Sequence, residues 1–574
     1  MRRALVVVSL LLCSFSAFAD GMKAVRGTSA AQARDFGRPA LVGAKAGLPA
    51  LATLGPLSEG DYESLRQWNE TAKGPMRVGV IRPLEQAAFA VAQRGTRTAV
   101  QSDTGVWRWS GRVNVEEGEQ LRLKLTGVNA PGATFWVYGN DGEAIGFDAS
   151  NAVDGVLWTP SVFSGSIYLE VQAALDANVK FSVDAVADIR PEAEVVTQGT
   201  ECFRDLSCMN STDLTNLSSG IARYQFPAEQ AGFVSLCTGG LIIDRGETFT
   251  PYFLTANHCV DNATDAAAVE AFWDYRRTSC GGTAPTLSTR PRSNGAQLVA
   301  TSDQSDVTLL RLNNVPGSRV FFGWDADANA VPAGTILSRI AHPAGQVANF
   351  TQERVDTTSF TCSGRPRGRY IYSQLTLGGT AGGSSGSPVW KEGGVIVGQL
   401  FGSCGPNLAD DCDTRNREVD GALSASWAVL KPHLDPEQQT GCGVCTPNST
   451  TACIIDGRFK VQLNWFTSFG PSLSGTGKII NYTENRPDTH PTFGAMSQNV
   501  FFSMYDHAPN AVEVIVRIFR GVSINDKWWV YVTGFSDTGY TVKVQDTRTC
   551  ATWEKTNAHG QFTLHRDVEA FPFP

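Results

Sequence analysis

Residues 382–389 (GGSSGSPV) decide the fold that we predict for this chain. Glycines on both sides of Ser385 let the backbone turn tightly and bring amide hydrogens close to a substrate carbonyl. A stretch rich in Gly and Ser is usually a flexible loop, but the strand-like run 395–400 (VIVGQL) follows at once. The stretch is therefore predicted to be a loop inside a folded sheet, with Ser385 as a candidate nucleophile.

A candidate general base lies upstream of this loop. Residues 252–258 (YFLTANH) form an apolar strand that ends at His258, and the adjacent Cys259 can tie the turn to Cys237 on the preceding strand. A histidine that acts as a general base needs a fixed position and tautomer. By itself, a histidine beside a cysteine is more often an incidental surface residue.

A candidate carboxylate lies between the two. Residues 305–312 (SDVTLLRL) place Asp306 at the entry of a hydrophobic strand. An aspartate there is often only a turn residue, but a strand entry can also supply the buried carboxylate that orients an imidazole.

The order of the three segments is informative. His258, Asp306 and Ser385 follow one another in the order of the chymotrypsin fold, which α/β-hydrolases and subtilisins do not use. The segments resemble the TAAHC, DITLL and GDSGGP motifs of trypsin-like serine peptidases, with Asn257 and Ser384 as departures. This resemblance implies a double β-barrel catalytic domain in which Ser385 attacks the scissile carbonyl, His258 accepts its proton and Asp306 holds His258. It also implies an oxyanion hole made by the backbone amides of Gly383 and Ser385.

A narrower resemblance covers roughly residues 200–436 and is to lysyl endopeptidases, secreted bacterial members of this clan. The matching strings are 202–208 (CFRDLSC), 237–240 (CTGG), 273–275 (WDY), 323–325 (GWD), 342–343 (HP) and 383–388 (GSSGSP). The resemblance implies the disulfides Cys202–Cys404, Cys208–Cys280 and Cys237–Cys259, with Cys362 and Cys412 left to pair by elimination. It also implies a removable N-terminal propeptide.

The expected substrate-binding residues follow from the same resemblance. Ser426 and Trp427 resemble a Ser-Trp strand that lies beside the substrate backbone, with Ser426 near the buried aspartate. Aligning on this pair puts Glu418 at the place of the acid that binds lysine in lysyl endopeptidases, with Asp420 two residues on. The acid that trypsins place six residues before the nucleophile is absent, because that position is Gly379.

The preferred residue at the cleavage site stays open. A carboxylate in the pocket would favour Lys or Arg through a charge-assisted pair, but Glu418 and Asp420 can equally be solvated loop acids. The glycine-rich stretch expected after Trp427 is missing. The only basic site in the expected maturation region is Arg190-Pro191, and proline after the scissile bond makes a poor substrate.

The rest of the chain also reads as β-structure. Alternating apolar and polar residues broken by Gly, Asn and Asp predict antiparallel strands in 101–188 and again in 452–574. The predicted class is all-β: a chymotrypsin-like double β-barrel flanked by N-terminal and C-terminal β-sandwich-like domains. The predicted segments are a signal peptide (1–19), a propeptide segment (20–100), a β-sandwich prodomain (101–188), the catalytic domain (199–436), a linker (437–451) and an accessory domain (452–574).

The first residues and the cysteines indicate export. Residues 1–19 combine a basic start, an apolar run and a small-x-small site at 17–19, as in a secretory signal peptide. Of the 13 cysteines, Cys13 lies in this segment, which leaves an even number for disulfides. Cys453 and Cys550 are expected to staple the C-terminal domain, and a Cys442–Cys445 pair is a guess. We predict a secreted protein, extracellular or periplasmic in transit.

Composition excludes some classes of partner. The formal net charge is −8, which argues against nucleic acid, and no later apolar run is long enough to span a membrane. The cysteine spacings do not favour zinc, so we expect no metal and no cofactor. The predicted protein is a monomeric serine endopeptidase that acts on proteins or peptides. The alternatives are a non-catalytic binding or adhesion protein on the same fold, and a peptidase with another preference at the cleavage site.

Overall fold

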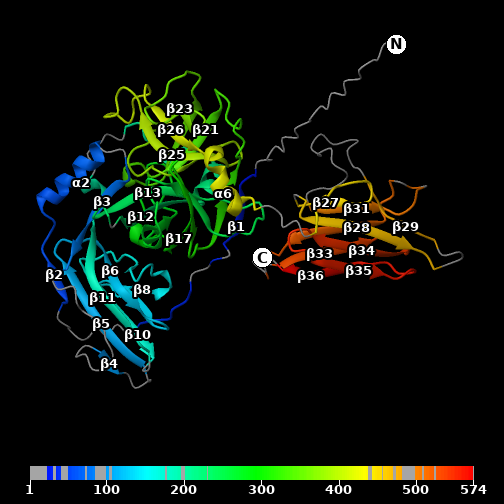
Figure 1. Cartoon of the computed structure of the whole chain (residues 1–574), viewed down its shortest axis with the longest axis horizontal. Coiled ribbons are helices and arrows are strands. Elements are labelled where there is room, and N and C mark those ends of the chain that lie inside the picture. The colour runs from blue at the N-terminus through cyan, green and yellow to red at the C-terminus, as the bar shows by residue number, and fades with distance from the viewer. Residues whose placement is uncertain are drawn as a thin grey trace, which may run out of the picture. The chain divides into compact units, whose positions relative to one another are not determined.

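A computed structural model gives the architecture of the chain (Figure 1). The chain divides into two compact units, Met1–Leu434 and Asp435–Pro574. The predicted signal peptide lies outside the described residues. The structure describes residues 22–29, 31, 34–39, 50–71, 74–84, 99–101, 106–174, 177–195, 201–228, 230–436, 442–455, 457–468, 473–480, 498–506, 508, 510–521, 525 and 527–572.

The protein is mostly β, with 47% strand and 11% helix, which confirms the predicted class. The barrel that carries Ser385 is closed, because its last neighbour in the sheet pairs back onto its first. Around this second barrel the strands run β21 (Ile336–Ala341), β22 (Asn349–Val355), β23 (Tyr370–Leu377), β26 (Arg417–Ala422), β25 (Val395–Cys404) and β24 (Pro388–Lys391), which pairs with β21 again.

The first barrel carries the histidine and the aspartate. Its strands are antiparallel, and they are β12 (Ile221–Ala228), β13 (Phe233–Leu241), β14 (Tyr252–Ala256), β15 (Glu270–Trp273), β16 (Arg292–Asn294), β17 (Ala296–Ser302) and β18 (Val307–Leu312). One hydrophobic core includes residues of both barrels, among them Trp273, Trp324 and Trp390. His258 follows β14 and Asp306 precedes β18, so the pairing of these two strands brings both residues to one end of the barrel.

The N-terminal region, residues 22–195, contains a β-sandwich with its own core. One layer is a six-stranded sheet of β2 (Ala52–Leu54), β4 (Ala99–Gln101), β5 (Val106–Val115), β7 (Thr134–Tyr138), β8 (Ala144–Phe147) and β10 (Ser166–Ala174). The other layer consists of β6 (Gln120–Asn129), β9 (Leu157–Trp158) and β11 (Lys180–Ile189).

Strand β3 (Met76–Pro83) joins this region to the first barrel. It pairs antiparallel with β11 on one side and with β13 on the other, so a single eleven-stranded sheet runs from the N-terminal sandwich into the barrel. Helix α2 (Glu59–Thr71) precedes β3 and lies beside it in Figure 1. A second N-terminal strand, β1 (Val25–Thr28), pairs with β19 (Ser318–Phe321) of the barrel region. The N-terminal region is therefore bound to the barrels by backbone pairing at two places.

The second unit is an independent all-β fold of two five-stranded sheets. In β33 (Lys527–Gly534) half-buried and buried residues alternate along the strand, as the sequence pattern predicts. Trp528 is buried in the core of this unit. Its remaining strands are β27 (Ala452–Ile454), β28 (Phe459–Phe466), β29 (Ser474–Thr476), β30 (Lys478–Ile479), β31 (Asn499–Ser503), β32 (Val514–Arg520), β34 (Gly539–Asp546), β35 (Thr552–Asn557) and β36 (Leu564–Pro572).

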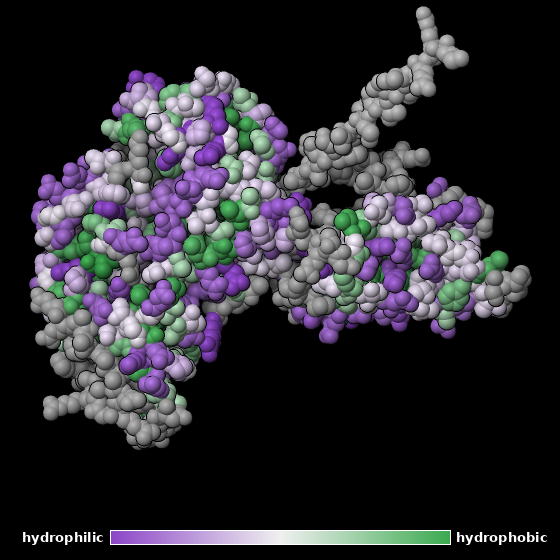
Figure 2. All heavy atoms as spheres, in the orientation of Figure 1, coloured by the Kyte–Doolittle hydropathy of each residue, from purple (hydrophilic) through white to green (hydrophobic). Residues whose placement is uncertain are grey.

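On the face shown in Figure 2, hydrophobic residues are scattered among hydrophilic ones. No helix in the described part of the chain is long and apolar enough to cross a bilayer.

Candidate active site

His258 and Asp306 are joined by two hydrogen bonds. The imidazole Nδ1 lies 2.7 Å from Asp306 Oδ2, and the backbone amide of His258 donates to Asp306 Oδ1 over 2.8 Å. Next to the histidine, the disulfide Cys237–Cys259 ties the turn to β13 as predicted. The ring therefore has a fixed orientation, with Nδ1 protonated toward the carboxylate and Nε2 left as the acceptor.

Asp306 is buried and holds an unusual backbone conformation, with φ at 56°. A non-glycine residue in this left-handed region costs about 1–3 kcal/mol unless the surroundings hold it there. The surroundings do so: the Gln399 side chain donates to the carbonyl oxygens of Ser305 (2.7 Å) and Asp306 (3.0 Å), and the amide of Asn257 donates to the Asp306 carbonyl over 2.9 Å.

The loop that carries Ser385 is fixed by glycines and by β13. Gly383 and Gly386 have φ of 94° and 79°, and a Cβ on Gly386 would lie 2.1 Å from Thr255 Oγ1, so larger residues are excluded there. Thr238 of β13 binds the loop twice, because its amide donates to the Ser385 carbonyl (2.9 Å) and its hydroxyl to the Gly383 carbonyl (2.8 Å). Among the described residues, the amides of Gly383 and Ser385 donate to no carbonyl, whereas the Ser384 amide donates to Ala381. These two amides are available to an acceptor from outside.

Phe401 of β25 contacts His258 and lines the same pocket as Ser385. Its ring packs edge-on against His258, with 5.7 Å between the ring centroids, and the residue lines a pocket together with Ser385. The Nε2 of His258 is buried and has no hydrogen-bond partner in the described part of the chain.

The pocket beside Ser385 has a volume of about 370 Å³, and acidic residues are among those that line it. Glu418 of β26 lines it, and its carboxylate accepts hydrogen bonds from the hydroxyls of Thr380 (2.7 Å) and Ser403 (3.2 Å). Burial raises the pKa of Glu418 to about 7. Asp411 also lines the pocket, and burial together with Asp410 raises its pKa to about 6. The pocket therefore offers two carboxylates to a cationic side chain.

The structure places three of the predicted substrate-binding residues away from the pocket that Ser385 lines. Asp420 does not line the pocket, because its buried carboxylate is bound by Arg339 at 2.5 Å. Ser426 and Trp427 do not form a strand beside the substrate: Ser426 ends the short 3-10 helix Leu423–Ser426, and Trp427 begins helix α6 (Trp427–Leu434). The Trp427 ring packs on Trp324 instead. The Ser426 hydroxyl lies 2.6 Å from that of Ser305, the residue that precedes Asp306 in the chain.

The sequence pattern predicted strand β25 but not that this strand lines the pocket. Leu400, Phe401 and Gly402 of β25 flank Ser385, and the Gly386 amide donates to the Leu400 carbonyl over 2.9 Å. A signal was present, because this strand-like run directly follows the Ser385 loop in the sequence.

The disulfides agree with the predicted cysteines but not with every predicted pair. Cys208–Cys280 forms as expected, whereas Cys202 pairs with Cys412 and Cys362 with Cys404. The two expected pairs exchanged partners because Cys404 ends β25, beside the loop that holds Cys362. In the C-terminal unit the bonds are Cys442–Cys550 and Cys445–Cys453, so neither the Cys453–Cys550 staple nor the Cys442–Cys445 pair is present.

The N-terminal region forms the other wall of the pocket. Residues Trp68–Thr71 of α2 and Gly74–Met76 line it opposite Thr380–Gly382. Helix α2 braces this wall: Trp68 Nε1 donates to the Pro75 carbonyl (2.9 Å), and the Asn69 side chain bonds to both the amide and the carbonyl of Arg77. At the start of β3, Met76 is paired with Leu236 of β13.

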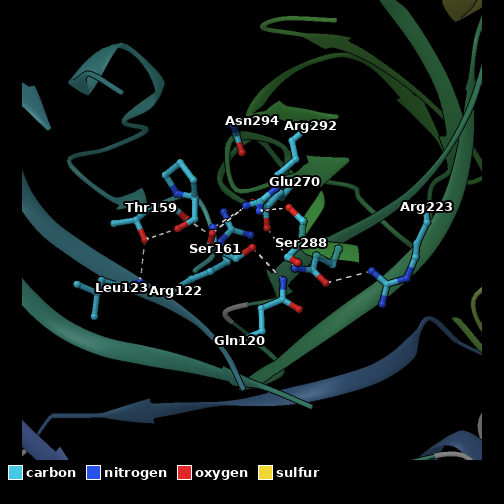
Figure 3. Close-up of polar contacts among 12 residues, drawn as sticks. Gln120, Arg122, Leu123, Thr159, Ser161, Arg223, Glu270, Ser288, Arg292 and Asn294 are labelled. Carbon is cyan, nitrogen blue, oxygen red and sulfur yellow. Dashed lines mark hydrogen bonds and ion pairs between the residues drawn. The ribbon is translucent and has the colours of Figure 1, made fainter. Parts of the chain in front are cut away.

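A buried polar network adds to this contact (Figure 3). Glu270 of β15 is fully buried; it accepts from the Ser161 amide (3.0 Å) and pairs with Arg292 at 3.5 Å. Arg122 and Arg292 lower the pKa of Glu270 against the opposing effect of burial. Arg122 and Ser161 belong to the N-terminal sandwich, so a charged side chain of the barrel is solvated by that region.

Sequence comparisons relate the chain to peptidases. Residues 196–416 match the family model described as "Lysyl endopeptidase, C-terminal domain". The chain is 27% identical to lysyl endopeptidase of Pseudomonas aeruginosa over 340 residues, which are 55% of this chain and 72% of the relative. The chain is therefore a peptidase with the trypsin-like fold. Within that class it is lysyl endopeptidase-like.

Two solved structures match part of the chain. The Rv3671c protease of Mycobacterium tuberculosis in its active form is 16% identical and covers 42% of this chain and 92% of its own, with a TM-score of 0.28. An inactive mutant form of the same protein is 14% identical and covers 42% and 97%, with a TM-score of 0.26.

Proposed function

We propose that this protein is a secreted serine endopeptidase in which His258, Asp306 and Ser385 form the catalytic triad. The observation that carries the proposal is the doubly hydrogen-bonded His258–Asp306 pair, located beside a serine loop with two available amides. The six disulfides favour an oxidising compartment, and the candidate signal peptide agrees with export.

The proposed reaction proceeds through an acyl-enzyme. His258 Nε2 removes the proton of Ser385 Oγ as the oxygen attacks the scissile carbonyl, and the amides of Gly383 and Ser385 stabilise the resulting oxyanion. The imidazolium then gives its proton to the leaving amine, which departs and leaves the acyl-enzyme. Water, activated by the same imidazole, hydrolyses this ester and restores Ser385. Asp306 stabilises the imidazolium in both halves of the reaction.

The pocket supports a preference for Lys or Arg before the scissile bond. Glu418, with its partner hydroxyls of Thr380 and Ser403, provides a fixed carboxylate for a charge-assisted hydrogen bond. Asp411 adds a second carboxylate on the same pocket. The name of the Pseudomonas relative agrees with this preference.

The preference should depend on pH in a defined direction. Because the pKa of Glu418 is raised to about 7, its charge is present above that pH and is lost as the pH falls below it. We expect the ratio of kcat/KM for a Lys peptide over that for a matched norleucine peptide to fall as the pH is lowered from 8 to 5. Effects of pH that act on both peptides alike cancel in the ratio. A ratio that stays constant over this range would exclude Glu418 as the residue that binds the cation.

The N-terminal region is proposed to be a propeptide that blocks the site. Residues 74–76 and α2 close one side of the pocket, and β3 occupies the edge of β13. An extended substrate that uses this edge must displace β3. The buried hydrogen bond from the Ser161 amide to Glu270, together with the electrostatic attraction between Arg122 and Glu270, keeps the region docked.

One experiment tests both the catalytic triad and the proposed blocking of the site by the N-terminal region. Residues 196–200 are replaced by the recognition sequence of a specific protease, and the chain is cut there. We expect a small organophosphate to label Ser385, and we expect a large increase in peptide hydrolysis only when the N-terminal region is separated from the cut protein. A Ser385→Ala chain is the control for both readouts. Full hydrolysis before separation would contradict the block, and no labelling of the separated enzyme would favour a non-catalytic binding protein.

A further inference from the structure

We propose that Asp420 is a positioning residue that determines specificity by keeping the positive charge of Arg339 from neutralising Glu418. The inference rests on the proposed function, because it concerns how the pocket beside Ser385 recognises a basic side chain. Asp420 itself does not line the pocket, so its effect is exerted through Arg339.

The guanidinium of Arg339 is hydrogen-bonded to residues other than Glu418. Arg339 of β21 is fully buried and does not line the pocket. Its Nη2 donates to Asp420 Oδ1 (2.5 Å) and Glu353 Oε1 (3.0 Å), and its Nη1 donates to the carbonyl (2.9 Å) and hydroxyl (3.2 Å) of Ser387. The Glu418 carboxylate instead accepts from Thr380 and Ser403. The guanidinium of Arg339 therefore binds Asp420, Glu353 and Ser387. The Glu418 carboxylate, which lines the pocket, accepts its hydrogen bonds from hydroxyl groups instead.

The charge balance below the pocket follows from these contacts. Three acids lie around one guanidinium: Glu353 on β22, and Glu418 and Asp420 on β26. Burial raises the pKa of Glu353 well above its usual value, which favours its protonated form. Asp420 is then the carboxylate that balances the charge of Arg339, which it binds at 2.5 Å. Glu418 and Asp411, which both line the pocket, provide the net negative charge that a lysine or arginine side chain meets.

The consequence is that removal of a carboxylate outside the pocket changes what the pocket prefers. In Asp420→Asn the shape is kept, but the charge of Arg339 is no longer cancelled and opposes a second cation in the pocket. The same uncancelled charge stabilises the Glu418 carboxylate and lowers its pKa. Loss of basic selectivity and an acid shift of its pH dependence should therefore occur together, which a merely structural role of Asp420 does not predict.

Matched variants make the proposal testable. The active processed enzyme is assayed with peptides that differ only in Lys or norleucine before the scissile bond. In Asp420→Asn we expect the ratio of the two kcat/KM values to fall at least about tenfold, and its pH midpoint to move down. Glu353→Gln should leave the ratio within about twofold, because Glu353 already holds a proton. The double variant Arg339→Met/Asp420→Asn should recover most of the Lys preference, because neither charge remains.

The outcomes separate this inference from the function on which it rests. An Asp420→Asn enzyme that melts cooperatively and keeps both the wild-type ratio and the wild-type pH midpoint would overturn the inference. So would a double variant that cleaves the norleucine peptide but stays as unselective as Asp420→Asn. A wild-type enzyme without Ser385-dependent cleavage would overturn the proposed function, and a wild-type enzyme that cleaves without preferring Lys would overturn the role of Glu418.

Discussion

Replacing Ser385 by Ala is expected to lower kcat by a factor of about 10⁶, because the acyl-enzyme can no longer form. His258→Ala should cost about as much, since serine and histidine act as one unit and the effects of removing them are not additive. The measurement is hydrolysis of a Lys peptide by the processed enzyme, with the N-terminal region removed. A residual rate about 10³–10⁴ above that in water should persist, because the oxyanion amides and the pocket remain.

The control for this prediction is substrate binding. Ser385 lines the pocket but is not one of its acidic residues, so Ser385→Ala should bind an uncleaved Lys peptide about as well as the wild type does. Hydrolysis by Ser385→Ala within tenfold of the wild-type rate would show that another nucleophile is responsible.

Asp306→Asn is expected to lower kcat by about 10⁴ while the fold is retained. The carboxylate accepts hydrogen bonds from both the amide and the Nδ1 of His258. An asparagine amide can donate to Nδ1, which favours the tautomer that carries the proton on Nε2 and so removes the base. The backbone should tolerate the change, because asparagine is one of the residues that adopt positive φ, and Asp306 has φ of 56°.

Two measurements identify the cause of that loss. The melting temperature of Asp306→Asn should stay close to that of the wild type, and KM should change far less than kcat, because Asp306 does not line the pocket. The assigned role would be contradicted if Asp306→Asn misfolded, because the loss of activity would then reflect loss of the fold. Retention of more than a tenth of wild-type kcat would contradict it too.

The sequence predicted local features of the site well. The histidine, the aspartate and the serine were each placed next to a strand, and strand pairing in a barrel brings such positions together. Two disulfides were also predicted correctly, and both lie next to matched motifs: Cys237–Cys259 beside His258 and Cys208–Cys280 at the segment 202–208. Features that depend on contiguous residues could therefore be predicted from the sequence.

Features that depend on long-range register were not. Glu418 and Asp420 lie on one strand and are both buried. The position of Arg339 on β21 decides that Asp420, and not Glu418, forms the ion pair. A helix rather than a strand at Trp427 depends on packing against Trp324. The pairing of β3 with β13 joins segments about 160 residues apart by backbone hydrogen bonds, which leave little trace in side-chain patterns.

Strand β3 gives the proposed removal of the N-terminal region a second consequence. While the region is attached, β3 is paired with the edge of β13. If the region is removed as proposed, the backbone groups along that edge lose their partners, and such an edge can pair with any strand, including one from another copy of the chain. The proposed processing would then favour association between processed molecules as well as access for substrates. Keeping the region attached while the chain is concentrated would prevent that association.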